Sequence, residues 1–262
     1  MEATAQEKTK SGAVREYGEP IIEIAHLQKS FGSNHVLTDF NLSIRRGENV
    51  VVLGKSGCGK SVLIKCIVGL LSYDAGSLKV FGKEINQLKQ KELDELRARI
   101  GFVFQSSALY DSMTVRENLE FPLRRHGKHK SKEEVNRLVE ETLENVGLLH
   151  AIDLMPVELS GGMRKRIGLA RSLILKPEIM LYDEPTTGLD PITAEEISKL
   201  MLAMQQKYNT SSIIISHDMH CAQLTANRLA VMIDGINYAQ GTFDELKKVT
   251  DPKVHAFFLN SH

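Results

Sequence analysis

The chain alternates short apolar runs with longer stretches in which apolar residues recur at helical spacing. The short runs predict strands, and several are continuous enough to be buried on both faces of a sheet. Helical patterns lie between them, an order typical of an α/β sheet with crossover helices. The predicted strands cover residues 21–27, 50–53, 78–81, 100–104, 179–182, 213–215 and 229–233.

Residues 106–159 interrupt this alternation, because they contain at least two helical patterns and no convincing strand. We therefore predict a helical subdomain at 106–159, inserted between a first part of the α/β core at 21–105 and a second part at 160–262. Residues 1–20 are polar and show no period, so we expect a flexible N-terminal extension.

The composition is that of an ordinary globular protein. Of 262 residues, 42% are apolar and 25% are charged, enough for one large domain or for a core with a subdomain. Lysine and arginine number 33, as do aspartate and glutamate, so the formal net charge is zero. Without a basic excess, the charge balance does not favour DNA, RNA or an anionic bilayer, and we expect no nucleic-acid partner.

The cysteines and the N-terminus indicate where the chain works. Cys58, Cys66 and Cys221 form no CxxC pair and are odd in number, which suits a reducing compartment better than a disulfide framework. The N-terminus has no apolar stretch of signal-peptide type, and no segment approaches the roughly 18 apolar residues of a membrane helix. We expect a cytoplasmic protein that reaches any membrane through a partner.

The most specific motif lies between the predicted strand 50–53 and an apolar helical run. It fits G-x-x-x-x-G-K-[ST], which in this context predicts a phosphate-binding loop rather than a plain glycine-rich turn. Its backbone N–H groups can turn toward phosphate oxygens, Lys60 can reach the β- and γ-phosphates, and the Ser61 hydroxyl can bind Mg²⁺. The loop residues are Gly54, Lys55, Ser56, Gly57, Cys58, Gly59, Lys60 and Ser61.

Two cysteines close to this motif have different expected properties. Cys58 lies inside the loop, next to a helix N-terminus, which lowers the pKa of a thiol. We therefore expect a reactive Cys58 thiolate that bound ATP protects from alkylation. Cys66 is predicted to be a buried and inert core thiol.

The apolar strand 179–182 ends in two carboxylates, Asp183 and Glu184. In a sheet of this kind, ligands bind at the carboxyl ends of the strands. We predict that Asp183 binds Mg²⁺, directly or through water, and that Glu184 polarises the water that attacks the γ-phosphate. Without the upstream loop, the pair could equally be a solvated strand end.

A second candidate anion site lies at Ser160, Gly161 and Gly162, which follow Leu159 and open a helical stretch. A hydroxyl group and exposed backbone N–H groups at a helix start can bind a phosphate. Ordinary helix capping would require only the serine.

Two polar residues follow further strands: Gln105 after strand 100–104, and His217 after strand 213–215. With the motifs above, they make the chain resemble the ATP-binding cassette (ABC) ATPases over nearly its whole length from Ile21. The resemblance implies a RecA-like P-loop core with an inserted α-helical subdomain and a small antiparallel β region. It also implies that residues 159–162 are the signature motif of that family, with Met163 in place of the usual glutamine.

The resemblance assigns further roles to single residues. It implies that Phe31 stacks on adenine, although an aromatic residue after a strand could also belong to the core. It implies that Gln105 contacts Mg²⁺ and the γ-phosphate, that Asp190 belongs to the D-loop, and that His217 is the switch histidine. A zinc site at His217 and His220 lacks a third nearby ligand.

The resemblance also implies an assembly. One chain carries one phosphate loop and one signature motif, so two copies would sandwich two ATP molecules head to tail, and hydrolysis would open the dimer. The dimer would serve membrane permease subunits from the cytoplasmic face of the bacterial inner membrane, as a peripheral subunit. Residues 106–121, which follow Gln105 and are rich in apolar side chains, are predicted to dock a cytoplasmic helix of the permease.

Segments 104–124, 158–193 and 251–260 look most like the ATPase subunits of Mla-type systems, which work with Mce-domain proteins in phospholipid transport. These residues do not touch lipid, so the substrate is inherited by analogy. An amino-acid or metal importer and a cell-division-type regulatory ATPase remain alternatives, because their nucleotide motifs would look the same. A non-hydrolysing scaffold is disfavoured because it would not need Glu184 and His217.

Overall fold

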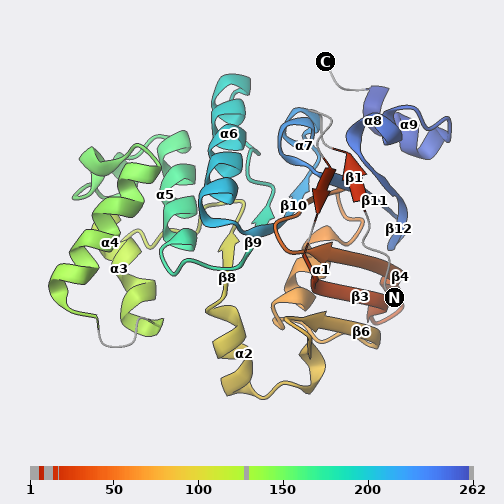
Figure 1. Ribbon diagram of the computed structural model, residues 1–262, viewed down its shortest axis with the longest axis horizontal. Helices are drawn as coiled ribbons and strands as arrows, with labels where there is room; N and C mark the ends of the chain where they lie inside the picture. The colour runs from red at the N-terminus through yellow and green to blue at the C-terminus, as the bar shows by residue number, and fades with distance from the viewer. Residues whose placement is uncertain (1–5, 9–13, 17, 127–129, 260–262) are drawn as a thin grey trace.

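The computed structural model describes residues 6–8, 14–16, 18–126 and 130–259 (Figure 1). Its helices are α1 (Lys60–Ile67), α2 (Gln90–Arg97), α3 (Val115–His126), α4 (Lys132–Asn145), α5 (Gly161–Leu173), α6 (Pro191–Tyr208), α7 (Met219–Thr225), α8 (Phe243–Lys247) and α9 (Pro252–Leu259). Its strands are β1 (Gln6–Lys8), β2 (Val14–Glu16), β3 (Pro20–Phe31), β4 (Asn34–Arg45), β5 (Asn49–Leu53), β6 (Ala75–Val80), β7 (Lys83–Glu84), β8 (Ile100–Val103), β9 (Ile179–Asp183), β10 (Ser211–Ser216), β11 (Arg228–Ile233) and β12 (Ile236–Gly241).

The main sheet has ten strands in the order β7-β6-β3-β4-β12-β11-β5-β10-β9-β8. Strands β11, β5, β10, β9 and β8 pair in parallel, as expected for strands joined by helical crossovers. Strand β3 pairs antiparallel with both β4 and β6, which forms the expected antiparallel β region. The fold class predicted from the sequence, an α/β P-loop core with these additions, is confirmed.

Strand β5 lies inside the parallel part of the sheet, and all five of its residues are buried. Because successive side chains point to opposite faces, Val50 and Val52 join one core cluster, which includes residues of α1. Val51 and Leu53 join a second cluster, which includes residues of α5, α6, α7, α8 and α9. The central strand that leads into the phosphate loop is thus held from both sides.

A third core cluster belongs to helices α3, α4 and α5, which lie side by side at one end of the molecule (Figure 1). Helix α5 contributes Ile167 and Ala170 to this third cluster. It contributes Leu169 and Leu173 to the second cluster, which also contains Val51 and Leu53 of β5. It therefore packs against both parts of the protein. The boundary expected between residues 159 and 160 remains a prediction, and α5, which begins just after it, packs on both sides.

The strand predictions missed the long strand β4, the strand β12, the two-residue strand β7 and a short pair at the N-terminus. Strands β4 and β12 were not expected, and both belong to the main sheet. Residues 6–8 and 14–16, expected to be loose, pair as the antiparallel strands β1 and β2. The rest of the predicted extension up to residue 17 lies outside the described residues.

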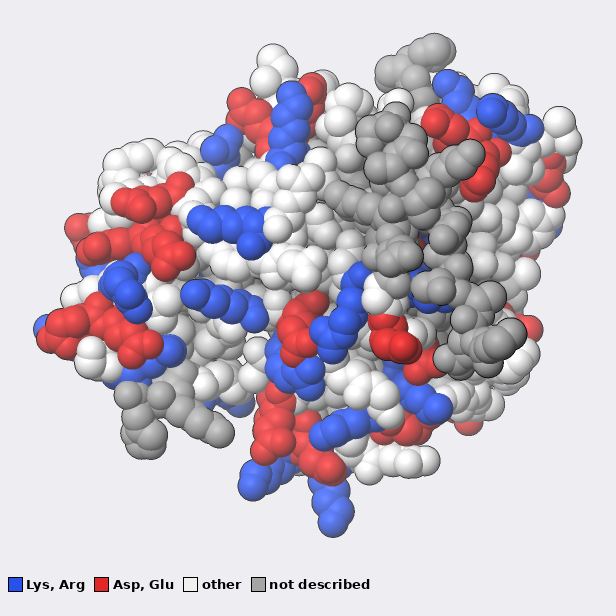
Figure 2. Space-filling view, viewed as in Figure 1, with Lys and Arg blue, Asp and Glu red and all other residues white. Residues whose placement is uncertain are grey.

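The surface charges are mixed. On the face shown in Figure 2, basic and acidic side chains are interspersed over both ends of the molecule. Among the helices in the described part of the chain, none is both long and apolar enough to cross a membrane.

Candidate active site

The phosphate loop connects β5 to α1, and its path depends on glycine. Gly57 and Gly59 have φ angles of 81° and 108°, a left-handed region that favours glycine. A Cβ atom on Gly54 would come within 3.0 Å of the Met232 carbonyl oxygen. The loop therefore turns tightly against strand β11, as a chain with side chains at these positions could not.

Lys60 lies at the centre of this loop. Its side chain is buried, and its Nζ donates hydrogen bonds to the carbonyl oxygens of Gly54 at 2.7 Å and Lys55 at 3.0 Å. The ammonium group of Lys60, the first residue of α1, is thus held by two carbonyl oxygens of the loop, next to the positive end of the helix. This arrangement suits the binding of phosphate groups.

Ser61 and Asp183 bring two kinds of oxygen ligand together. The Ser61 hydroxyl donates to Asp183 Oδ1 across 3.4 Å. Burial, and then the charge of Glu184, raise the pKa of the Asp183 carboxyl, and a cation bound there would offset this effect. The donor set fits Mg²⁺, which usually takes one or two protein oxygens and shares the rest with phosphates and water. No cluster of three or more metal-binding side chains occurs among the described residues, in keeping with this sharing.

Glu184 is held in an unusual conformation directly after β9. Its φ is 51°, which is strained for a residue other than glycine and is a feature of functional sites. Its carboxylate accepts a hydrogen bond from the Thr187 hydroxyl at 3.2 Å, and its Oε2 lies 2.7 Å from His217 Nδ1. The Glu184 side chain is 15% exposed and that of His217 is 65% exposed. Two groups therefore fix a carboxylate at the edge of an open site.

These residues share one cavity of about 680 Å³. The residues predicted from the sequence that line it are Phe31, Lys55, Ser56, Gly57, Gly59, Lys60, Ser61, Gln105, Asp183, Glu184 and His217. Phe31 is 48% exposed at its rim, which excludes the core alternative for this residue. Strand ends far apart in the sequence thus converge on one site, at the carboxyl edge of the parallel strands.

The second predicted anion site lies outside this cavity. Ser160 is the N-cap of α5, and its hydroxyl accepts a hydrogen bond from the Met163 N–H at 3.2 Å. A Cβ atom on Gly162 would come within 2.8 Å of the Thr193 side chain, so this glycine permits close packing of α5 on α6. Gly161 and Ser160 are exposed. One chain therefore presents two separate sites with exposed polar groups.

Asp190 also lies outside the cavity. Its carboxylate caps α6, where it accepts hydrogen bonds from the N–H groups of Ile192 and Thr193 and from the Thr193 hydroxyl. Within this chain the residue acts as a helix cap, and its implied contact with nucleotide remains a prediction.

The expectation for Cys58 is wrong in its electrostatics. Its thiol lies beneath Gly54 and lines a different cavity of about 460 Å³, beside Met232 and Phe257. Burial raises the pKa of the Cys58 thiol, although the charge of Lys60 acts in the opposite direction. Cys66 is fully buried as expected, and burial raises its pKa to about 11.

Sequence reasoning missed Val36, Val62 and Thr187, which line the cavity, and Lys165, which contacts the loop that carries Gln105. Thr187 lines the cavity and donates to Glu184, and only its place in the stretch after Glu184 could have indicated it. Lys165, on helix α5, donates from Nζ to the Gln105 carbonyl oxygen at 2.6 Å. The sequence gives no signal for this contact, because the two residues are 60 positions apart.

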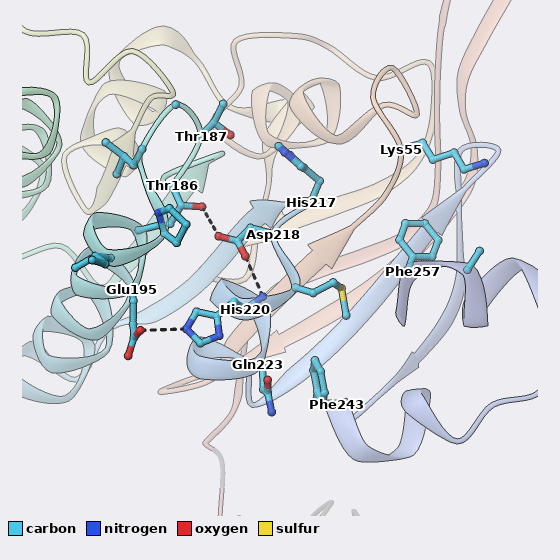
Figure 3. A pocket seen from close by; sticks show the side chains of 17 residues that line it. Lys55, Thr186, Thr187, Glu195, His217, Asp218, His220, Gln223, Phe243 and Phe257 are labelled. Carbon is cyan, nitrogen blue, oxygen red and sulfur yellow. Dashed lines mark hydrogen bonds and ion pairs between the residues drawn. The ribbon is translucent and has the colours of Figure 1, made fainter. Parts of the chain in front are cut away.

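A larger cleft of about 980 Å³ adjoins the phosphate cavity, and the two share Lys55, Thr187 and His217 (Figure 3). It runs along the first turn of α6, helix α7 and helix α9. Its wall includes Ile192, which is 75% exposed. Asp218 fixes one side of the cleft by accepting a hydrogen bond from the Thr186 hydroxyl.

A phosphate loop at the end of a central parallel strand, an oxygen pair suited to Mg²⁺ and a fixed carboxylate together define a P-loop nucleoside triphosphatase. The family profile described as "ABC transporter" matches residues 37–187. The chain belongs to the ABC transporter family, as one of its ATP-binding domains, and the family resemblance predicted from the sequence is confirmed.

Relatives and solved structures agree with this assignment. The chain is 39% identical to the "Probable ribonucleotide transport ATP-binding protein mkl" of Mycobacterium leprae, over 90% of this chain and 68% of that protein. It is 36% identical to the "Intermembrane phospholipid transport system ATP-binding protein MlaF" of Haemophilus influenzae, over 90% of this chain and 89% of that protein. It is 37% identical to the "Methionine import ATP-binding protein MetN" of Campylobacter jejuni, over 92% of this chain and 76% of that protein. A dimeric ATP-binding cassette bound to ADP and Pi superposes with a TM-score of 0.77 at 30% identity, over 84% of this chain and 98% of that one.

The protein is therefore an ATPase that binds ATP with Mg²⁺. Its reaction transfers the γ-phosphoryl group of ATP to water, which demands positioning and charge stabilisation more than covalent chemistry. The Glu184 carboxylate would then orient the water and accept its proton, and Lys60 would stabilise charge on the phosphates; both roles remain predictions. Ser61 and Asp183 would hold Mg²⁺, which neutralises charge on the same phosphate oxygens.

Proposed function

We propose that this ATPase powers phospholipid transport for envelope lipid homeostasis, together with permease subunits and an Mce-domain partner. The observation that carries the proposal is the similarity to MlaF, which covers 89% of that protein's length, against 76% for the MetN relative. The likeness of segments 104–124, 158–193 and 251–260 to Mla-type ATPases supports it. The MetN relative, at 37% identity, supports an amino-acid importer as the second candidate.

The test is to isolate the complex from membranes through a tag on this chain and to identify the proteins bound to it. An Mce-domain protein among them would support phospholipid transport, whereas a periplasmic solute-binding protein would establish the importer. Deletion of the gene gives an independent check, because the proposal predicts loss of outer-membrane lipid integrity. An intact envelope after deletion would overturn the lipid assignment.

The second part of the proposal is a head-to-tail dimer with ATP between the subunits. In one chain the exposed Ser160 lies outside the phosphate cavity, so a second copy would have to supply the signature motif to that cavity. The similar cassette of known structure is described as dimeric. The cleft beside the cavity, with the exposed Ile192, offers an apolar surface for such an interface.

The substitution Ser160→Arg tests this arrangement. A bulky cation at the signature serine should block the partner's phosphate site, so we expect ATP hydrolysis to fall by about two orders of magnitude. ATP binding by the monomer should persist, because Ser160 lies outside the phosphate cavity of its own chain.

Ser131→Arg is the matched control, since Ser131 caps α4 with the same contact, to the Glu134 N–H at 3.2 Å. Loss of the cap alone should leave the ATPase rate near that of the parent. Separate titrations of ATP binding and of turnover distinguish the outcomes. Equal loss of monomer binding and of activity in Ser160→Arg would contradict the composite site.

The third part of the proposal is a docking site for the permease at residues 106–121. Of the apolar residues in this segment, Val115 is buried and Leu109 packs on the helical cluster, whereas Tyr110 is 43% exposed. The Tyr110 and Phe121 rings pack at a tilt of 51° with centroids 4.9 Å apart, and both line a surface hollow of about 240 Å³. A permease helix in this hollow would attach the chain to the cytoplasmic face of the inner membrane.

Tyr110→Asp should uncouple the ATPase from its permease, because it replaces the exposed aromatic ring beside Phe121 with a small charged side chain. We expect recovery of permease subunits to fall at least about tenfold, while the isolated chain keeps its basal ATPase rate. Leu259→Asp is the control, since Leu259 is 61% exposed on α9 at the other end of the molecule. Normal assembly of the Tyr110 variant would disprove the docking site.

A further inference from the structure

Two side chains of helix α5 donate hydrogen bonds to the loop that carries Gln105. Lys165 Nζ donates to the Gln105 carbonyl oxygen at 2.6 Å. Arg171, two turns along the same helix, donates from Nη1 to the Ala108 carbonyl oxygen at 2.7 Å. Between them, a Cβ atom on Gly168 would come within 3.1 Å of the loop side chain at Ser107, so the loop lies directly on the helix. These three α5 positions, spaced by three residues, form one face.

The loop itself has a conformation that needs such support. Ser107 and Ala108 have φ angles of 63° and 46°, which are unfavourable for residues with a Cβ atom. Gln105, just before them, is exposed and lines the phosphate cavity. The position of its side-chain amide therefore depends on how the adjoining backbone is held.

Lys165 is an uncommon residue for a structural contact, because it is buried and charged. Burial lowers the pKa of its ammonium group, while the negative charge of Glu184 acts in the opposite direction. A buried cation is costly unless it is well bonded, and here the Lys165 ammonium donates its hydrogen bond to the loop that carries Gln105. The charge thus contacts the loop outside the cavity lining and lies near enough to Glu184 to feel its charge.

We propose that Lys165 is a positioning residue for hydrolysis, which fixes Gln105 in the phosphate cavity by holding its main-chain carbonyl oxygen. This inference rests on the proposed role of Gln105 at the γ-phosphate and Mg²⁺. Lys165 itself does not line the cavity, so it acts through the loop. Helix α5 begins at its N-cap Ser160, in the second anion site, and contacts Gln105 of the phosphate cavity through Lys165. A displacement of this helix at Ser160 would therefore also move Gln105.

The test is a double-mutant cycle between Lys165→Met and Gln105→Ala, with kcat and the KM for ATP measured for each protein. Lys165→Met removes the ammonium but keeps an unbranched side chain, and we expect kcat to fall about tenfold with KM changed less than about twofold. The double variant should be no slower than Gln105→Ala, because Lys165 then has nothing left to position. Lys165→Arg should restore kcat to within about threefold, since a guanidinium can donate to the same carbonyl.

Arg166→Met is the matched control, because Arg166 is a cation on the same helix that pairs with Glu196 instead of the loop. Its kcat should equal that of the parent. If Lys165→Met does not fold, Lys165→Gln replaces it in the cycle, with a smaller loss expected because a neutral donor remains. An unchanged kcat in Lys165→Met would overturn the positioning role. So would a double variant whose fold-loss in kcat equals the product of the two single losses. An unchanged kcat in Gln105→Ala would instead refute the proposed role of Gln105.

Discussion

Glu184→Gln should bind ATP as the parent does and lose its hydrolysis. The amide keeps the shape of the carboxylate and can keep one contact to Thr187 or His217, but it cannot accept a proton from water. Removal of a general base costs about 10²- to 10⁴-fold in rate, so we expect kcat to fall within that range. The dissociation constant for ATP should change by less than about threefold, because Lys60 and the phosphate loop are untouched.

The control for this prediction lies at the other end of the same strand. Glu178 precedes β9 and pairs with Arg46 and Arg99, far from the carboxyl edge where Glu184 lies. Glu178→Gln should therefore lower stability slightly and leave the turnover number intact. Single-turnover hydrolysis and equilibrium ATP binding, measured on protein free of contaminating ATPases, separate the two effects. A Glu184→Gln variant that turns over like the parent would show that another group is the base.

The residues of the phosphate loop could be predicted from the sequence because their constraints are local. Gly57, Gly59 and Lys60 lie within a few residues of one another, and the strand before them and the helix after them fix the chain path. Asp183 and Glu184 were found for a related reason, since a buried strand shows where its carboxyl end must be. In both cases the signal and the site occupy the same short segment.

Other features depend on contacts that no short segment contains. Cys58 was placed correctly in the loop, but which side its thiol faces is decided by Gly54 and by Met232 on another strand. That neighbourhood buries the thiol and reverses the expected direction of its pKa shift. Lys165 could not be recognised for the same reason, because its partner Gln105 comes from a distant loop.

Strands β4 and β12 were missed because the pattern of apolar residues is interrupted in one and weak in the other. In β4 the buried residues Leu37 and Phe40 are three positions apart and the pairing with β3 shifts register there, so the alternation of a strand holds only from Phe40 to Ile44. Strand β12 has no buried residue at all and is held by its backbone pairing with β11. Backbone hydrogen bonds form without an apolar signature, which is why periodicity does not find β12.

Lys60→Met should abolish ATP binding at micromolar concentrations and with it all turnover. The Lys60 ammonium is the positive charge inside the loop, where two carbonyl oxygens hold it in place. A thioether of similar length fills the space without the charge, so the phosphates lose their strongest partner in a buried site. We expect the dissociation constant for ATP to rise at least about 100-fold, since a lost charge-assisted bond that leaves a buried phosphate oxygen unpaired costs about 3 kcal/mol.

Lys65→Met supplies the matched comparison, because Lys65 is on the same helix but points to solvent. It should bind ATP within about threefold of the parent, as expected for an exposed charge screened by water. Thermal unfolding of both variants, each without nucleotide, checks that the loop and α1 remain folded. Near-parental ATP binding by Lys60→Met would mean that the loop backbone and the helix N-terminus hold the phosphates alone, and that the lysine acts only in the hydrolysis step.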